Sequence, residues 1–246
     1  MNAVGIIPAR YHSTRLPGKP LLRDTGKYLV QHVWERAAQA RSLDRLIIAT
    51  DDEGICRAAA EFGAEARMTS AEHRTGTDRI AEVAADLPHD VVVNIQGDEA
   101  EIEPDAIDAA VGALDRAPGA VMATLASRTT DRSRAADRNV VKVVLDTDGG
   151  ALYFSRAPIP HHRDADGEPV FLLHVGLYAY RRKFLLEFAG MPQTPLEQTE
   201  KLEQLRALEN GRVIQVAETD YEALGIDTPA DYQAFVQRYR EKGQAP

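Results

Sequence analysis

Short apolar runs alternate with helix-like segments along the first half of the chain, and this alternation constrains the fold more than any other feature. Residues 3–8, 46–50 and 91–95 are apolar runs of the length and composition of buried strands. Residues 29–40 and 53–62 carry a helical pattern, with Asp51 and Asp52 available to cap the second segment, and Pro104 opens a further helix. The repetition predicts an α/β fold, with a mostly parallel sheet and helices on both faces.

The second half of the chain has a different pattern. Residues 140–145, 151–155 and 170–180 are strand-like, with few helices between them. We therefore expect a single domain over residues 1–246 that carries a small, β-rich inserted subregion at about residues 140–195. Such a layer can close over a nucleotide site or build a dimer surface, and the sequence leaves both uses open.

Composition excludes several classes of protein. At 246 residues the chain can bury one sizeable core. Its 29 Lys and Arg against 38 Asp and Glu give a net charge of −9, which disfavours binding to nucleic acid or anionic lipid. There is no signal-like N-terminus, no apolar stretch of the ~20 residues that a membrane span needs, and one cysteine, Cys56. We expect a cytoplasmic protein that is neither secreted nor membrane-spanning.

The loop after the first apolar run is the strongest local signal of function. Three cations, Arg10, Arg15 and Lys19, cluster there in an otherwise acidic chain, and Gly18 allows the backbone to approach a ligand. Loops at this position in α/β sheets bind anions, so the pattern favours a triphosphate. It matches neither the common phosphate-binding loop ending in Lys-Ser/Thr nor the three-glycine dinucleotide fingerprint. The alternative is a solvated basic turn.

Eight motifs in order along the chain resemble the sugar cytidylyltransferases, over almost all of residues 3–239. They are IPARYHSTRLPGKPL from Ile7, HRTGTDR from His73, NIQGDE from Asn94, NVVKVVLD from Asn139, ALYFSRAPIP from Ala151, HVGLYAYR from His174, LEQTEKLEQLRALENG from Leu196 and GIDTPADY from Gly225. The resemblance implies a Rossmann-like fold, CTP as the donor, Mg²⁺ as the cofactor and a homodimer. It implies an acidic sugar as the acceptor, with 3-deoxy-manno-octulosonate (Kdo) expected and its 8-amino derivative or a sialic acid left open.

The resemblance also implies roles for individual residues. Catalysis would fall to Arg10, Arg15, Lys19 and Asp98. The nucleotide would be bound by Pro8, Ala9, Arg10, Arg15, Lys19, Thr75, Gly76, Thr77, Gln96 and Gly97. The acidic sugar would be bound by Arg79, Gln96, His174, Tyr178, Glu203 and Gln204.

Two aspartates are the expected magnesium ligands. Asp98 follows the run at 91–95, and Asp227 precedes the C-terminal helical segment. Magnesium binds one or two carboxylates together with phosphate oxygens and water, and the family places its metal at these matching positions. The alternatives are a turn aspartate at Asp98 and a helix cap at Asp227, because Asp227-Thr228-Pro229 resembles a helix N-terminus.

The proposed sugar ligands have structural alternatives as well. An arginine at position 79 suits bidentate binding of a sugar carboxylate. His174 can instead be a core histidine, and Glu203 and Gln204 can belong to a solvated helix face. In the same region of the first half, Thr75 or Thr77 can cap a helix, and Gly76 permits close approach of a ligand.

Two other functional classes fit the sequence less well. A non-catalytic nucleotide-binding regulator of the same fold would be expected to lack the cations or the metal ligands, and all of them are present here. A purely structural interaction module does not explain why cations and carboxylates gather at the predicted strand ends.

Overall fold

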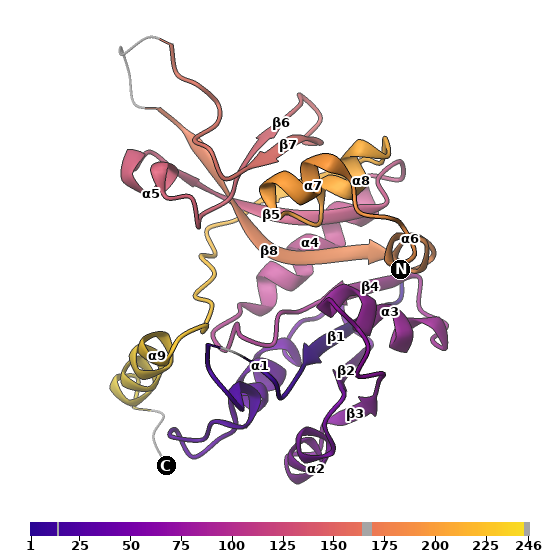
Figure 1. The fold of residues 1–246 in the computed structure, drawn as a ribbon, viewed down its shortest axis with the longest axis vertical. Coiled ribbons are helices and arrows are strands. Elements are labelled where there is room, and N and C mark those ends of the chain that lie inside the picture. The colour runs from indigo at the N-terminus through magenta and orange to yellow at the C-terminus, as the bar shows by residue number, and fades with distance from the viewer. Residues whose placement is uncertain (14, 164–168, 244–246) are drawn as a thin grey trace. The chain divides into compact units, whose positions relative to one another are not determined.

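The computed structural model describes residues 1–13, 15–163 and 169–243, and the chain forms two compact units. The first unit comprises Met1–Asp108 and Ala223–Pro246, and the second comprises Ala109–Glu222. The chain therefore returns to the first unit at its C-terminal end (Figure 1). A division into two compact units does not tell how many folding domains the chain has. The single domain over residues 1–246 therefore stays a prediction.

The first unit contains a parallel sheet with the strand order β3-β2-β1-β4. Its strands are β1 Ala3–Ala9, β2 Arg45–Thr50, β3 Glu65–Met68 and β4 Val91–Asn94. Its helices are the short 3-10 helix η1 Lys19–Leu21 and the α-helices α1 Leu29–Ala37, α2 Glu53–Glu61, α3 Gly76–Ala85 and α9 Pro229–Glu241. Helix α4, Pro104–Arg116, has residues in both units.

The order of these strands creates a switch point between β1 and β4. The chain moves outward from β1 to β2 to β3 and then crosses to β4 on the other side of β1. Right-handed connections therefore place α1 and α2 on one face of the sheet and α3 on the other. Ligands of such sheets bind at the carboxyl ends of the strands beside this point.

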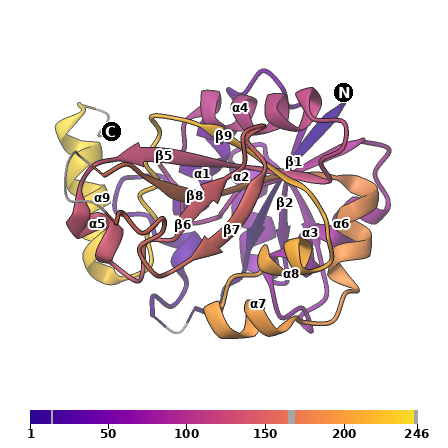
Figure 2. The same cartoon turned by 90° about the horizontal axis from the view of Figure 1, so that it is seen from above.

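The second unit is rich in strands, most of which pair in antiparallel fashion. Its strands are β5 Met122–Thr129, β6 Lys142–Leu145, β7 Ala151–Ser155, β8 Phe171–Arg181 and β9 Ile214–Glu218, and its helices are α5 Arg132–Ala136, α6 Arg182–Ala189, α7 Pro195–Glu200 and α8 Leu205–Glu209. Strand β8 pairs with β5 and β6, and β6 pairs with β7, all in antiparallel fashion (Figure 2). Strand β9 runs parallel to its neighbour β5.

The fold-class prediction is confirmed, and the predicted strands and helices of the first half are present with small differences at their ends. Asp52 caps α2 by accepting from the Ile55 N–H, and Thr75 caps α3. The suggestion that Asp227 caps the last helix is wrong, because Thr228 holds the N-cap position and Asp231 completes its capping box. Among the described residues, no helix is both long and apolar enough to cross a lipid bilayer.

Helix α9 packs against α1 through an aromatic cluster. The His32 ring meets the rings of Phe235 and Tyr239 edge-on, at centroid distances of 5.1 and 4.8 Å. Burial lowers the pKa of His32 to about 4, so the imidazole is neutral at neutral pH and bonds to the Thr25 hydroxyl at 2.7 Å. The contact places the C-terminal helix beside the first helix of the parallel sheet.

Candidate functional site

A cavity of about 400 Å³ lies at the switch point of the parallel sheet. This volume is within the usual range for small-molecule sites. Its walls come from the loop after β1, the start of α3, the loop after β4 and the residue before the α9 cap. The lining residues are Pro8, Ala9, Arg10, His12, Ser13, Arg15, Lys19, Pro20, His73, Thr75, Gly76, Arg79, Gln96, Gly97, Asp98 and Asp227.

Two glycines let the backbone fold tightly around this cavity. Gly18 has a positive φ of 66°, and its N–H donates to the Tyr11 carbonyl, which closes the basic loop. At Gly97 an added Cβ would lie 2.7 Å from the Pro8 carbonyl oxygen, so only glycine allows the loop after β4 to approach the end of β1 this closely. The basic loop is therefore closed by its own backbone and approaches the start of the loop after β4, while the side chains of Arg10 and Arg15 remain exposed.

The centre of the cavity holds a cluster of opposite charges. Lys19 Nζ lies 3.0 Å from Asp98 Oδ2 and 3.3 Å from Asp227 Oδ1, and it donates to the Ile226 carbonyl at 2.9 Å. Arg15 Nη2 lies 3.1 Å from Asp227 Oδ2. Only 15% of the Lys19 side chain is exposed, so its charge acts where water screens it weakly. The structure thus brings together two aspartates that lie far apart in the sequence.

The two aspartates suit a magnesium ion. Both carboxylates reach one cation, Lys19, and both remain open to the cavity, with 27% and 42% of their side chains exposed. Across residues 1–13, 15–163 and 169–243, no group of three or more His, Cys, Asp or Glu side chains is placed to hold a metal. Magnesium does not need such a group, because it takes one or two carboxylates and completes its shell with phosphate and water.

The HRTGTDR motif forms the start of α3 and one wall of the cavity. The Thr75 hydroxyl accepts from the Asp78 N–H, and Asp78 bonds back to the Thr75 N–H, which forms a capping box. Gly76 and Thr75 line the cavity, whereas Thr77 is buried in the helix and is not among the lining residues.

Arg79 faces the same cavity but is already paired. Its guanidinium is 2.8 Å from Asp51 Oδ2 and also donates to the Thr69 hydroxyl, and only 3% of the residue is exposed. Arg79 is therefore held rigidly by β2 and its neighbours. Binding of a sugar carboxylate would use the part of the guanidinium that faces the cavity.

In the second unit, His174 and Tyr178 stand together on β8. Their rings lie 5.4 Å apart, and burial lowers the pKa of His174 to about 3. The Thr124 hydroxyl lies 3.0 Å from His174 Nε2 and within hydrogen-bond distance of the Val175 and Leu177 carbonyls, at 3.0 and 2.9 Å, so it holds the imidazole in place. Burial, followed by the nearby charge of Glu203, raises the pKa of Tyr178. Both groups are thus neutral donors and acceptors, as binding of sugar hydroxyls requires.

Glu203 and Gln204 are not on a solvated helix face. Gln204 is 4% exposed, and its side-chain Nε2 has no hydrogen-bond partner among the residues that the structure describes. Such a buried amide usually finds a partner, and a ligand hydroxyl can supply one. Glu203 Oε1 lies 3.5 Å from Arg206 Nη2, and Arg206 is itself held by the buried carboxylate of Glu197 at 2.6 Å.

The structure adds lining residues that were not among those expected from the sequence. His12, Ser13, Pro20 and His73 all border the cavity. Each of these residues lies within a motif quoted above, so the motifs indicated the segments that line the cavity. Which side chains of a segment face the cavity depends on the conformation of its loop. Of the predicted sugar ligands, Arg79 and Gln96 belong to the first unit, and His174, Tyr178, Glu203 and Gln204 belong to the second.

The chain belongs to the cytidylyltransferase family, whose sequence profile matches residues 4–215. It is 54% identical over 230 residues to a 3-deoxy-manno-octulosonate cytidylyltransferase of Solibacter usitatus, which covers 94% of this chain and 91% of that relative. It is 52% identical to the protein of that name from Syntrophotalea carbinolica, over 94% of this chain and 96% of the relative.

Solved structures agree with this assignment. The chain superposes with a TM-score of 0.94 on CMP:2-keto-3-deoxy-manno-octonic acid synthetase complexed with CTP, at 41% identity, covering 98% of this chain and 100% of that one. A cytidylyltransferase from Leptospira borgpetersenii, at 16% identity and a TM-score of 0.67, covers 98% of this chain and 87% of its own length, and shares the fold.

Proposed function

We infer that this protein transfers CMP from CTP to Kdo and forms CMP-Kdo and pyrophosphate. The observation that carries this function is the charged centre of Lys19, Asp98 and Asp227 at the switch-point cavity. It occurs in a chain that shares about half of its residues with enzymes named for this reaction. Its product would supply activated Kdo for lipopolysaccharide assembly.

The transfer is an in-line displacement at the α-phosphorus of CTP. The anomeric hydroxyl oxygen of the sugar forms a bond to that phosphorus, the bond from the phosphorus to the bridging oxygen breaks, and pyrophosphate leaves with the electron pair. Negative charge builds up on the phosphate oxygens during this step. Arg10, Arg15 and Lys19 line the cavity where that charge would develop, and fixed cations stabilise it.

Asp98 and Asp227 would hold magnesium in this reaction. When bound, the ion would neutralise phosphate charge and lower the pKa of the attacking hydroxyl. The chain's own contribution is to keep the two carboxylates together. Lys19 contacts both of them, and the Ile226 N–H donates to the Asp98 carbonyl at 3.0 Å. The proton of that hydroxyl would pass to solvent, and we assign no side chain of the cavity the role of a base.

For the acceptor, each unit offers groups of its own. In the first unit, Arg79 lines the cavity and suits the sugar carboxylate. In the second unit, the buried Gln204 amide and the His174 and Tyr178 pair are neutral polar groups that suit sugar hydroxyls. The buried Gln204 amide favours discrimination between sugars, because a site that must satisfy its own buried polar groups rejects sugars lacking the matching hydroxyl.

Two further properties belong to this proposal. The protein acts as a homodimer in the cytoplasm, as the resemblance to the sugar cytidylyltransferases implies. Its net charge of −9 disfavours nucleic acid and anionic lipid as partners, so the substrate anions are bound by the local cluster of cations.

The acceptor is tested by pyrophosphate release. CTP and Mg²⁺ are supplied with Kdo, with its 8-amino derivative or with N-acetylneuraminate, and each reaction is repeated with a chelator. We expect release with Kdo at least about tenfold faster than with the other sugars, because one mismatched polar group costs about 1.4 kcal/mol or more. The chelator should abolish release.

The other outcomes of this assay are equally informative. Preference for another sugar would identify that sugar as the acceptor and leave the proposed reaction at the α-phosphorus unchanged. Pyrophosphate release that persists in the chelator would show that the reaction does not need magnesium. Tight CTP binding with no release from any sugar would favour a non-catalytic regulator of the same fold.

A further inference from the structure

The loop that carries Asp98 is attached to helix α9 at a second point. Three residues beyond Asp98, the Glu101 carboxylate accepts from Arg238 Nε and Nη2 at 2.8 and 2.6 Å through one oxygen. Its other oxygen accepts from Lys242 Nζ at 2.9 Å. Only 19% of the Glu101 side chain is exposed, so these charge-assisted bonds are partly shielded from water. We refer to Glu101, Arg238 and Lys242 as the Glu101 clamp.

The same helix carries Asp227 at its other end. The Asp227 N–H and the Thr228 N–H both donate to Asp231 Oδ2, at 3.1 and 2.8 Å, within the first turn of α9. Asp227 therefore moves with the helix rather than with a loose loop. Arg238 lies eleven residues further on, which corresponds to roughly 16 Å along the helix axis. The loop and the helix are thus joined at both ends: at Asp98 by the Ile226 N–H, and at Glu101 by the clamp.

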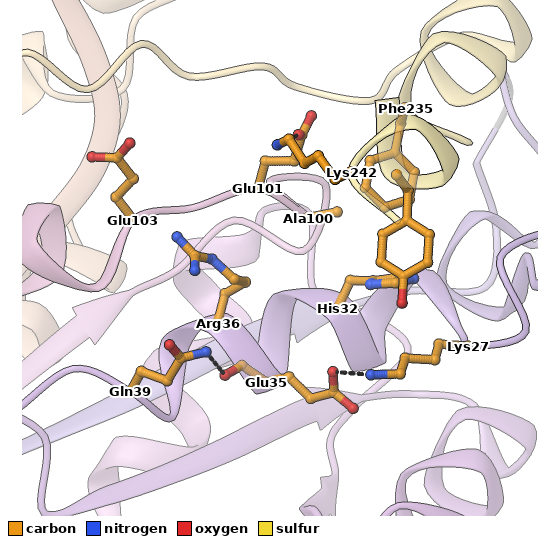
Figure 3. Close-up of a pocket in the computed structure, with 11 residues that line it drawn as sticks. Lys27, His32, Glu35, Arg36, Gln39, Ala100, Glu101, Glu103, Phe235 and Lys242 are labelled. Atoms are coloured by element: carbon orange, nitrogen blue, oxygen red, sulfur yellow. Dashed lines mark hydrogen bonds and ion pairs between the residues drawn. The ribbon is translucent and has the colours of Figure 1, made fainter. Parts of the chain in front are cut away.

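Packing alone does not hold the clamp end of α9. The buried residues of the helix are Tyr232, Phe235 and Val236, all in its first eight residues. Beside the last turn is a cavity of about 670 Å³ between α1, residues 100–103 and α9, and Figure 3 shows Lys242 reaching toward Glu101 at its edge. Beyond Val236, α9 is held by the Tyr239 ring against His32, by a hydrogen bond from Arg240 to the Asp24 carbonyl at 3.2 Å and by the ion pairs of Glu101. Because a hollow seam offers few other contacts, the ion pairs are a large part of this attachment.

The charged side chains around the cavity support this role for the ion pairs. Lys27 is paired with Glu35 at 2.6 Å on the α1 side (Figure 3). Arg36 donates to the Ile102 carbonyl at 2.9 Å and holds the far end of the loop. Burial acts to raise the pKa of Glu101, but hydrogen bonds from Arg238 and Lys242 outweigh it, and the net pKa is lowered. The Glu101 carboxylate is therefore ionised at neutral pH.

We propose that Glu101 is a positioning residue for the reaction: through Arg238 and Lys242 it fixes α9 so that Asp227 stands beside Asp98. The proposal rests on the inferred role of these two aspartates as metal ligands. Without the clamp, α9 remains attached through its buried first half, the Ile226 link and the contacts of Tyr239 and Arg240, but its angle is less restricted. The two carboxylates then spend less time at the spacing that one cation requires.

The test is metal binding rather than turnover. Mn²⁺ is titrated into the protein with CTP and without a sugar, and its binding is followed by water-proton relaxation. Glu101→Gln keeps the shape of the side chain and removes its charge. We expect about tenfold weaker Mn²⁺ binding, with the affinity for CTP in the absence of metal unchanged within threefold.

A matched control separates positioning from general stability. Glu65 also accepts from two arginines in the same unit, Arg45 at 2.8 Å and Arg67 at 3.1 Å, but it lies on β3, away from the Asp98 loop. Glu65→Gln should lower the thermal midpoint about as much as Glu101→Gln and leave Mn²⁺ binding unchanged. Arg238→Met should reproduce the effect of Glu101→Gln, and the double variant should be no worse than either single one.

The outcomes distinguish this proposal from the proposed function. Mn²⁺ affinity in Glu101→Gln within twofold of wild type would overturn the positioning role, as would an equal loss in Glu65→Gln. If Glu101→Gln does not fold, Arg238→Lys gives the same test, with a smaller loss expected because lysine keeps one contact. Undiminished Mn²⁺ binding by Asp98→Asn would instead show that Asp98 is not a metal ligand, which contradicts the proposed metal site.

Discussion

Replacing Asp98 by asparagine is expected to lower turnover about a thousandfold while leaving the protein folded. That loss corresponds to about 4 kcal/mol of transition-state stabilisation. Asparagine has nearly the same shape but no charge, so it weakens the hold on a divalent cation and breaks the ion pair with Lys19 Nζ at 3.0 Å. The backbone contact from the Ile226 N–H to the carbonyl of residue 98 survives the change.

This variant is measured by steady-state pyrophosphate release over a range of Mg²⁺ concentrations. Asp115→Asn, on the exposed face of α4, is the control for loss of one negative charge and should behave as wild type. Circular dichroism and the thermal midpoint report folding. Turnover of Asp98→Asn within tenfold of wild type at saturating Mg²⁺ would remove Asp98 from the catalytic centre.

Replacing Lys19 by methionine is expected to lower kcat/KM for CTP by about two to three orders of magnitude. Methionine removes a cation from the position where phosphate charge develops, and one such interaction is worth roughly 3 to 4 kcal/mol. It also removes the charge that Asp98 and Asp227 share, at 3.0 and 3.3 Å, so the two carboxylates repel each other.

The comparison with arginine identifies what Lys19 does. Lys19→Arg keeps the charge, but a planar guanidinium cannot replace an ammonium group that contacts Asp98, Asp227 and the Ile226 carbonyl at once. We expect it to recover only part of the activity. Lys183→Met, exposed on α6, controls for loss of a lysine charge. Full activity of Lys19→Met would show that the cluster is structural and does not act on the nucleotide.

Much of the parallel sheet could be predicted from the sequence because its strands are buried on both faces. The apolar runs at 3–8, 46–50 and 91–95 correspond to β1, β2 and β4 within a residue or two at each end. Strand β3 was not predicted, because its residues are partly or largely exposed and it has no continuous apolar run. Strand β5 was not predicted either, because it begins with an alanine-containing segment whose composition also suits a helix.

The candidate site was predictable in its segments but not in its contacts. The basic loop and Asp98 follow strands whose ends meet at one edge, which elementary topology predicts. Asp227 is different, because its approach depends on how α9 returns to the sheet, and only the family resemblance indicated it. The Glu101 clamp lay beyond sequence reasoning, since it depends on the rotation of α9 about its own axis.

Cytidylyl transfer from CTP to Kdo at this centre can be followed by ³¹P nuclear magnetic resonance of one reaction mixture. With CTP, Kdo and Mg²⁺, we expect loss of the three triphosphate signals and equal growth of one phosphodiester signal and pyrophosphate. Omitting Kdo should leave CTP intact. Formation of CDP and inorganic phosphate, or no change in the CTP signals with Kdo present, would show that the protein does not catalyse this transfer.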